Sequence, residues 1–529
     1  MFKYNALRRV LAVTLSLSIV SGPALAAEWN LSKGDITVDT SGAAQTVSQN
    51  GGSSVVDLAP VIKQLSTTAT NVIIITGGGT ANLTIQDLNV ESFSSSIHVD
   101  GTTTANITAN GTNTLTASSN AQAAVHVSDG TLNLNTTAGS TVNATSTNEG
   151  AAIGSNSAEQ MTGSIHLTGS GTVNATAGID TTTARGATIG SGYDGDLTGS
   201  ISIEDTNVHA VSNGFGAGIG SGFGADVQQS GTIVTGSGDV SAQSIRSAAG
   251  IGSGEYNSFR GTIQLGSGDV TAISGSDIHN SGYGAGIGSG YSGDFTGTVI
   301  TGPGKVNAES KLRGAGIGAA TDGMYNGSIQ IGTGEVNAVS PYGSDIGQGK
   351  DSDVGQNASV TVTKGTTING TVIENPDQLD GIAPGIGKTQ MVDPPVPETP
   401  DPEKPNPDPE TSLPEEKPET APEATVPSQV PYWVLSEGQA VKAQSQLSGG
   451  VLTVTCDQEN AEFNCTRGGL QMLKTQGVKT VVFHTAGAES SFDVDTLLDA
   501  MESGTVKLSH QGAKAQLLVN NEDQSKLLK

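Results

Sequence analysis

The stretch GAGIGSGYSGDFTGTVITGPGKVNAES, residues 284–310, decides the fold of this chain, because close copies of it recur along most of the sequence. It contains almost no side chain capable of catalysis. The stretch begins with the motif GAGIG, which contains Ile287. Equivalent aliphatic residues recur along the chain, each 28 to 36 residues after the one before. The series is Ile97, Val125, Ile153, Ile189, Ile219, Ile251, Ile287, Ile317 and Ile346. A repeat with a period near 30 residues predicts a solenoid.

Each repeat contains two further short motifs that are rich in β-branched residues. One follows Gly-Ser or Gly-Thr, and its leading residues are Ile165, Ile201, Ile233, Ile263, Val299 and Ile329. The other is Val-x-Ala, led by Val173, Val208, Val240, Val270, Val306 and Val336. Three short β-branched words separated by Gly, Ser, Asn and Asp turns predict three strands per turn of chain. We therefore expect a mainly β protein, a right-handed parallel β-helix of about ten coils, with equivalent strands stacked about 4.8 Å apart.

The ends of the chain differ in composition from these repeats. A positively charged start, an apolar run at residues 11–20 and Ala24-Leu25-Ala26 are typical of a cleaved signal peptide. Pro alternates with acidic residues in 393–427, which predicts an extended spacer. We therefore divide the chain into a signal peptide (1–26), an N-terminal cap (27–90), the parallel β-helix (91–375), a loop with an acidic Pro-rich linker (376–431) and a small α/β domain (432–529).

The charge and the hydropathy of the chain argue against binding to nucleic acid and against a transmembrane segment. The formal net charge of −27 argues against nucleic acid, because binding phosphates requires clustered Lys and Arg. After the signal peptide no apolar run is long enough to predict a transmembrane segment. The tetrapeptide Leu-Pro-Glu-Glu at residues 413–416 resembles the start of a sortase signal but lacks its Thr-Gly. We expect a secreted monomer, extracellular or associated with the cell surface without a sortase anchor.

The chain has two cysteines, Cys456 and Cys465, both in the C-terminal part. In an exported protein a disulfide between them is the expected use. A reduced pair is the alternative. Two thiols alone make a poor zinc site.

Aromatic residues follow the Ile word in several repeats, although only 4% of the chain is aromatic. They are Tyr193, Phe223, Tyr256, Tyr291 and Tyr325, and the acids Asp196, Asp226 and Asp294 lie three residues beyond three of them. Sugar rings stack on aromatic faces and carboxylates accept hydrogen bonds from hydroxyl groups, so this row predicts a glycan-binding stripe. The alternative is that rings one coil apart stack on one another and stiffen the loops.

Two other sets of polar residues are candidates for metal ligands. Asp345, Asp351 and Asp353 are close in sequence, and oxygen ligands of this kind can hold Ca²⁺, with solvated turn acids as the alternative. His98 and His126 share one phase of successive repeats, but no third ligand has that phase, so we expect an outward polar ladder there. No other cofactor is expected.

The GAGIG words, the Gly-Thr-Ile strand and the Val-x-Ala strand resemble the Gly-Ala-Gly-Ile-Gly-repeat surface proteins of gut bacteria, over roughly residues 70–375. The resemblance implies an adhesin-like or carbohydrate-binding protein. Our leading hypothesis is a non-catalytic β-helix that binds glycans or polymers of host or bacterial surfaces. The alternative is a polysaccharide lyase or glycosidase on the same scaffold. It is weakened because basic residues in the repeats are few and dispersed, and because no word departs from the repeat as an active site usually does.

Overall fold

A computed structural model provides the coordinates. It describes residues 27–528 except 65–67, 180–183, 225–227, 278–280, 380–382, 384–388, 395–431, 437–438, 441–442, 467–469, 471–472, 475–477, 502–504 and 520–521. The signal peptide and nearly all of the Pro-rich linker that the sequence predicts therefore lie outside the described residues. No helix in the described part of the chain is long and apolar enough to cross a membrane.

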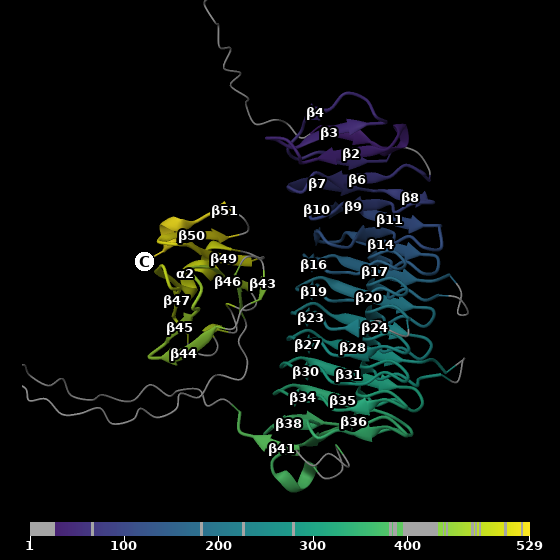
Figure 1. Ribbon diagram of the computed structural model, residues 1–529, viewed down its shortest axis with the longest axis vertical. Coiled ribbons are helices and arrows are strands. Elements are labelled where there is room, and N and C mark those ends of the chain that lie inside the picture. Colours follow the sequence, from purple (N-terminus) through teal and green to yellow (C-terminus); the bar gives the residue numbers. More distant parts are fainter. Residues whose placement is uncertain are drawn as a thin grey trace, which may run out of the picture.

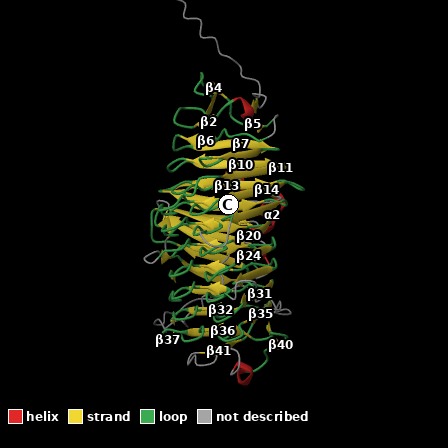
Figure 2. Ribbon diagram, turned by 90° about the vertical axis from the view of Figure 1, so that its right-hand side faces the viewer, coloured by secondary structure: helices red, strands yellow, loops and turns green. Residues whose placement is uncertain are grey.

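The repeats form a parallel β-helix built from three long sheets, as Figures 1 and 2 show. Sheet A contains β1 (Glu28–Asn30), β5 (Val61–Lys63), β7 (Thr80–Gln86), β10 (Thr104–Asn110), β13 (Thr131–Thr136), β16 (Ser164–Thr168), β19 (Ser200–Ile203), β23 (Thr232–Thr235), β27 (Thr262–Gln264), β30 (Thr298–Ile300), β34 (Ser328–Ile331), β38 (Ser359–Thr363) and β41 (Thr389–Val392). Sheet C contains β8 (Asn89–Ser92), β11 (Thr112–Ala117), β14 (Thr141–Ser146), β17 (Thr172–Ala177), β20 (Asn207–Ser212), β24 (Val240–Ser244), β28 (Val270–Ser274), β31 (Lys305–Ser310), β35 (Glu335–Val339), β39 (Thr367–Ile368) and β40 (Thr371–Val372).

Sheet B contains the strands that carry the Ile series. After a cap of β4 (Val55–Val56), β3 (Thr46–Gln49) and β2 (Ile36–Asp39), it contains β6 (Ile73–Thr76), β9 (Ile97–Val99), β12 (Val125–Val127), β15 (Ile153–Gly154), β18 (Ile189–Gly190), β21 (Ile219–Gly220), β25 (Ile251–Gly252), β29 (Ile287–Gly288), β32 (Ile317–Gly318) and β36 (Ile346–Gly347). Two short pairs lie at a corner, β22 (Gln228–Gln229) with β26 (Ser258–Phe259), and β33 (Met324–Tyr325) with β37 (Asp353–Val354).

The predicted phase of the Ile series is confirmed by strand register. Ile97 pairs with Val125, Val125 with Ile153, and each later member with its counterpart in the next coil, as far as Ile346. All these side chains are at most 2% exposed and belong to one continuous core. Burying each aliphatic side chain contributes about 1.5–3 kcal/mol, so stacked aliphatic rows hold the coils together.

From Ile153 to Ile317, the glycine after each Ile is required by the stacking of the coils. Gly190 has φ +135° and Gly220 has φ +141°, values that L side chains rarely adopt. A Cβ atom on Gly220 would also lie 1.7 Å from the carbonyl oxygen of Gly252 in the next coil. The glycine that follows Ile in these coils is therefore explained by close backbone packing in sheet B.

The solenoid is longer than the expected 91–375. Parallel coils are already present at Ile73, where β6, β7 and β8 supply one strand to each sheet. The cap is the antiparallel meander β2–β3–β4, with the 3₁₀ turn η1 (Leu31–Lys33) before it. At the other end β40 folds back antiparallel on β39, while β41 still adds to sheet A beyond the 3₁₀ turn η2 (Pro376–Leu379).

The C-terminal part is an α/β body with its own core. One sheet has the order β43 (Gln439–Ala440), β42 (Tyr432–Ser436), β46 (Asn460–Thr466), β49 (Thr505–Gln511), β50 (Lys514–Val519) and β51 (Glu522–Asp523), followed by η3 (Ser525–Leu527). The other has the order β44 (Gln444–Ser448), β45 (Val451–Thr455), β47 (Thr480–His484) and β48 (Glu489–Asp493). Helix α2 (Val494–Ala500) is capped at its N-terminus by Asp493, whose side chain accepts a hydrogen bond from the Thr496 amide.

The expected disulfide is not formed: Cys456 and Cys465 are both buried and are not bonded to each other. Cys465 lies in β46 of the six-stranded sheet, while Cys456 follows β45 of the four-stranded sheet. Burial raises the pKa of the Cys465 thiol. Both cysteines therefore act as small core residues.

Candidate ligand-binding edge of the solenoid

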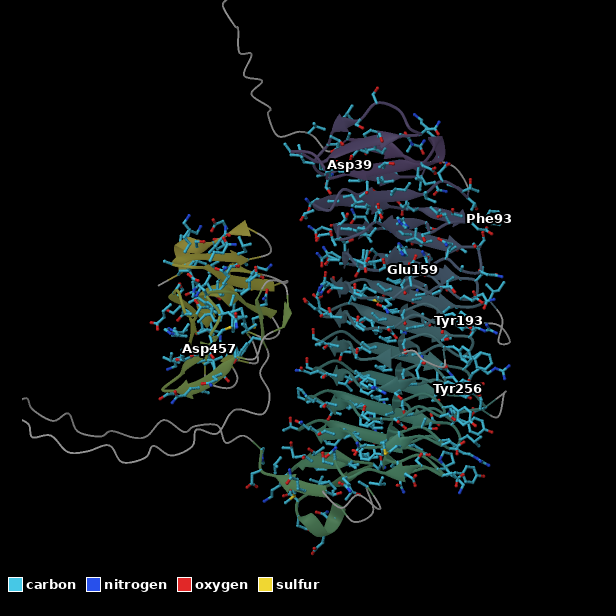
Figure 3. The ribbon with its side chains drawn as sticks, viewed as in Figure 1. Asp39, Phe93, Glu159, Tyr193, Tyr256 and Asp457 are labelled. Carbon is cyan, nitrogen blue, oxygen red and sulfur yellow. The ribbon has the colours of Figure 1, made fainter. Side chains whose placement is uncertain are left out.

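Four of the predicted aromatic residues form a continuous row in the loops that follow the sheet B strands. The ring centroids of Tyr193 and Phe223 are 5.8 Å apart, those of Phe223 and Tyr256 5.6 Å, and those of Tyr256 and Tyr291 5.6 Å. Tyr256 is 43% exposed and the other three are partly exposed. Figure 3 shows Tyr193 and Tyr256 on the same edge of the solenoid as the strongly exposed Phe93. We call Tyr193, Phe223, Tyr256 and Tyr291 the aromatic row.

Tyr256 enters the row from a different backbone position. Its φ is +64°, in the left-handed region, where other coils place residues such as Asp194 (φ +57°) and Ser292 (φ +57°). The position before it, which holds a ring in the other members of the row, is occupied by Glu255. Glu255 is only 7% exposed, and its Oε2 has no hydrogen-bond partner among the described residues. Burial raises its pKa to about 7, against the opposing charge of Arg246.

Tyr325 does not belong to the aromatic row, which corrects the sequence-based assignment. Its side chain is fully buried, and its hydroxyl group donates a hydrogen bond to the Ser359 carbonyl at 2.7 Å. Its ring stacks on Phe295, and Phe295 stacks on Phe259, each pair with centroids 5.4 Å apart. All three residues lie eight positions after their Ile, whereas Tyr193, Phe223 and Tyr291 lie four positions after theirs. They fill an inner corner of the coil.

The acidic residues predicted beside the row are engaged within the solenoid. Asp196 accepts a hydrogen bond from the Gln160 side chain at 3.2 Å, and Asp294 accepts one from the Met324 amide at 2.9 Å. Both bonds link successive coils. Asp226 lies outside the described residues.

The predicted calcium cluster is not assembled. Asp345 accepts hydrogen bonds from the Ser340 amide at 3.1 Å and from the Asn369 side chain at 2.8 Å. Asp351 pairs instead with Lys350 at 3.7 Å, and Asp353 is exposed in β37. Across the described part of the chain, no group of three or more His, Cys, Asp or Glu side chains is arranged to hold a metal ion.

The two histidines of the first coils are neighbours, as their shared phase predicted, but only one is partly exposed. The rings of His98 and His126 stack with centroids 4.3 Å apart. His126 is 4% exposed, and its Nε2 lies 2.7 Å from a carboxylate oxygen of Glu159. The hydrogen bond with His126 lowers the pKa of Glu159. The predicted outward ladder is therefore covered at its second member by a loop of the following coil.

A second column of side chains, missed in the sequence, lies beside the aromatic row. It occupies the corner between sheets C and B, four or five residues before the sheet B Ile of each coil from Ile189 to Ile346, and we call it the corner column. Its members in successive coils are Arg185, Phe215, Arg246, Tyr283, Arg313 and Tyr342. Arginine alternates with an aromatic residue at each step. The constant spacing before Ile was the signal that could have found it.

The corner column and the aromatic row touch one another. The guanidinium carbon of Arg185 lies 4.9 Å from the centroid of the Tyr193 ring. The ring of Phe215 lies 5.8 Å from that of Phe223, and the ring of Tyr283 lies 5.4 Å from that of Tyr291. Within the corner column, Arg246 covers Phe215 and Arg313 covers Tyr283, both at 5.8 Å. These contacts make one edge rich in aromatic rings and arginine.

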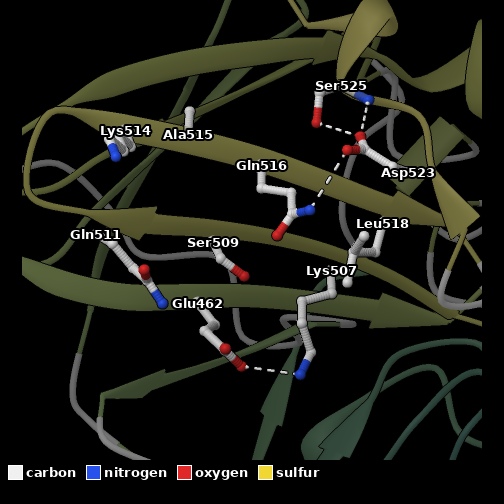
Figure 4. Close-up of a pocket in the computed structure, with 10 residues that line it drawn as sticks. All are labelled: Glu462, Lys507, Ser509, Gln511, Lys514, Ala515, Gln516, Leu518, Asp523 and Ser525. Carbon is white, nitrogen blue, oxygen red and sulfur yellow. Dashed lines mark hydrogen bonds and ion pairs between the residues drawn. The ribbon is translucent and has the colours of Figure 1, made fainter. Parts of the chain in front are cut away.

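The C-terminal body has a hollow of about 530 Å³ on the outer face of β46, β49 and β50 (Figure 4). Its polar side chains are largely paired with each other. Glu462 and Lys507 form an ion pair at 3.1 Å, and Asp523 accepts hydrogen bonds from Ser525 and Gln516. No nucleophile or catalytic base is singled out there by this geometry.

No protein-family model, curated protein or solved structure matches the chain. The assignment of function therefore depends on the geometry of the edge.

Proposed function

We propose that this protein is a non-catalytic, exported β-helix that binds an extended glycan along the aromatic row. The observation that carries the proposal is the spacing of Tyr193, Phe223, Tyr256 and Tyr291, one ring per coil on a partly exposed edge. A row of rings along the solenoid axis offers successive contacts to a linear polymer. Such multivalency favours long chains over single sugars.

The composition of the chain supports a specific use for these rings. Aromatic residues make up only 4% of the sequence. Several of the most buried rings lie outside the aromatic row, in the stack of Phe259, Phe295 and Tyr325 and in the C-terminal core. Ring pairs in the aromatic row are tilted by 20°, 75° and 54°, whereas the buried pairs around Phe295 are tilted by 16° and 10°. A less regular exposed row leaves parts of its ring faces and edges open to a ligand.

The test is the triple variant Tyr193→Ala, Tyr256→Ala and Tyr291→Ala, measured on a panel of polysaccharides by affinity electrophoresis. Each ring contact is expected to contribute about 1–3 kcal/mol, as for bases on aromatic platforms, so the variant should lose more than tenfold in affinity. Its β-type circular dichroism should persist. Phe93→Ala is the matched control, since Phe93 is 84% exposed on the same edge but outside the row. Unchanged affinity with lower stability in the triple variant would assign the rings a purely structural role.

A further inference from the structure

The corner column places arginines at a regular interval along the edge. Arg185, Arg246 and Arg313 lie in every second coil, with Phe215 and Tyr283 in the coils between them. Coils stack about 4.8 Å apart, so the arginine positions of the column recur about every 9.6 Å along the axis. That interval matches the length of one disaccharide in an extended polysaccharide.

Arginine is concentrated here although the chain is strongly acidic. The coils contain four arginines, and only Arg260 is outside the corner column. Each column arginine lies over an aromatic ring, which orients its planar guanidinium group.

Arg185 and Arg313 make at most a weak ion pair with the carboxylates around them. Arg185 is 3.9 Å from Glu149, at the limit of an ion pair, and its side chain is 42% exposed. Arg246 faces the buried Glu255. Arg313 has no carboxylate oxygen within 4 Å among the described residues, and its contact is with the Tyr283 ring. The exposed Asp194 is another acid on this edge.

From this arrangement we propose that the edge recognises an acidic glycan that carries one carboxylate or sulfate group per disaccharide. The aromatic row would contact the sugar rings, and Arg185, Arg246 and Arg313 would each bind one anionic group. The proposal rests on the glycan-binding function proposed above and specifies its ligand. The net charge of −27 does not oppose it strongly, because charges more than about 8 Å away are screened at physiological salt.

The experiment compares hyaluronan, which has one carboxylate per disaccharide, with its carboxyl-reduced neutral derivative and with chondroitin sulfate. Wild-type full-length protein should bind hyaluronan or chondroitin sulfate at least tenfold more tightly than the neutral polymer, and this preference should shrink as salt is raised. Chondroitin sulfate has a sulfate group in addition to the carboxylate of each disaccharide, so tighter binding of chondroitin sulfate than of hyaluronan would show that sulfate is also bound, and equal binding would assign the preference to the carboxylate. Either preference supports the proposal.

Arg313→Gln is the sharpest variant, because Arg313 has no carboxylate partner that the substitution would leave buried and unpaired. It should reduce affinity for the acidic polymer about tenfold and leave affinity for the neutral polymer unchanged. Arg260→Gln, an exposed arginine outside the column, is the matched control and should change neither. Arg313→Lys should recover only part of the loss, because lysine keeps the charge but not the planar fork.

Two results would overturn the inference. Equal binding of acidic and neutral polymers, together with loss of both in the triple tyrosine variant, would reject acidic recognition and leave the proposed glycan binding intact. Absence of binding to any polysaccharide of the panel would reject both.

Discussion

At the scale of single residues, the serine two positions after Ile has a structural role that the hydrophobic pattern of the repeat does not predict. Ser191, two residues after Ile189, is fully buried. Its hydroxyl group donates to the Gly195 carbonyl at 2.7 Å and accepts from the Gly222 amide of the next coil at 3.1 Å. The equivalent Ser253 makes the same two bonds. A buried hydroxyl with both roles satisfied joins neighbouring loops without leaving polar groups unpaired.

The glycine of the same word leads to the first prediction at this scale. Gly220→Ala should destabilise the solenoid by more than about 3 kcal/mol, because a strained φ is combined with a Cβ placed on the Gly252 carbonyl. Gly365→Ala is the control: φ is +87° there, but no atom lies within 4 Å of the added Cβ. It should cost about 1 kcal/mol, the backbone strain alone. Urea unfolding followed by circular dichroism measures both, and equal costs would show that the carbonyl contact relaxes.

The histidine pair leads to a prediction about pH. Burial, and secondly repulsion from His126, lower the pKa of His98, while Asp100 and Glu159 oppose the shift. Folded protein therefore takes up this proton less readily than unfolded protein. Stability should fall as pH drops below the ordinary pKa of histidine, about 6.5, until it reaches the lowered pKa of His98. The lowered pKa of Glu159 adds a further loss as pH falls below about 4.5.

The measurement is the urea midpoint at pH 8, 6 and 5 for the wild type and for His98→Gln. The variant keeps a polar side chain of similar reach but cannot be protonated, so its midpoint should decline less between pH 8 and pH 5. Parallel declines in the two proteins would show that other groups govern the response to acid.

At the scale of elements, a feature could be predicted where one type of residue recurs at a constant position within the coil. Ile219 and its counterparts are buried and in register because an aliphatic position that faces the core tolerates few alternatives. Tyr325 was misassigned because rings at two different offsets from Ile were treated as one row. The corner column escaped notice because arginine and aromatic residues alternate there, so no single residue type repeats. Spacing from the buried Ile was the better guide than residue identity.

Other features of the elements could not be predicted from local patterns. The separation of Cys456 and Cys465 depends on which of two sheets each strand joins, a long-range choice that the sequence of either strand does not encode. The hydrogen bonds of Asp345 similarly depend on Asn369, which is 24 positions away and belongs to the next coil. Proximity in sequence was therefore a poor predictor of both a disulfide and a metal site in this fold.

At the scale of the whole molecule, the described residues form two hydrophobic cores that share no member. The first runs from Leu31 to Ala383 through the solenoid, and the second from Val434 to Val519 in the C-terminal body. Each coil of the solenoid packs mainly on its neighbours, so its stability is expected to be nearly additive along the axis. The C-terminal body has a core of its own, which should allow it to fold independently.

Limited proteolysis tests this division. The sequence between the two cores, residues 393–427, alternates Pro with Asp and Glu and is too poor in apolar residues to form a third core. A protease that cleaves after glutamate should therefore cut there first, leaving one resistant fragment that contains the solenoid and one that contains the C-terminal body. The folded bodies on either side protect the remaining glutamates, since cleavage requires locally unfolded chain. Mass spectrometry of the fragments identifies the first cuts. A first cut within 73–363, or a single resistant fragment that spans both cores, would contradict the division into two independent bodies.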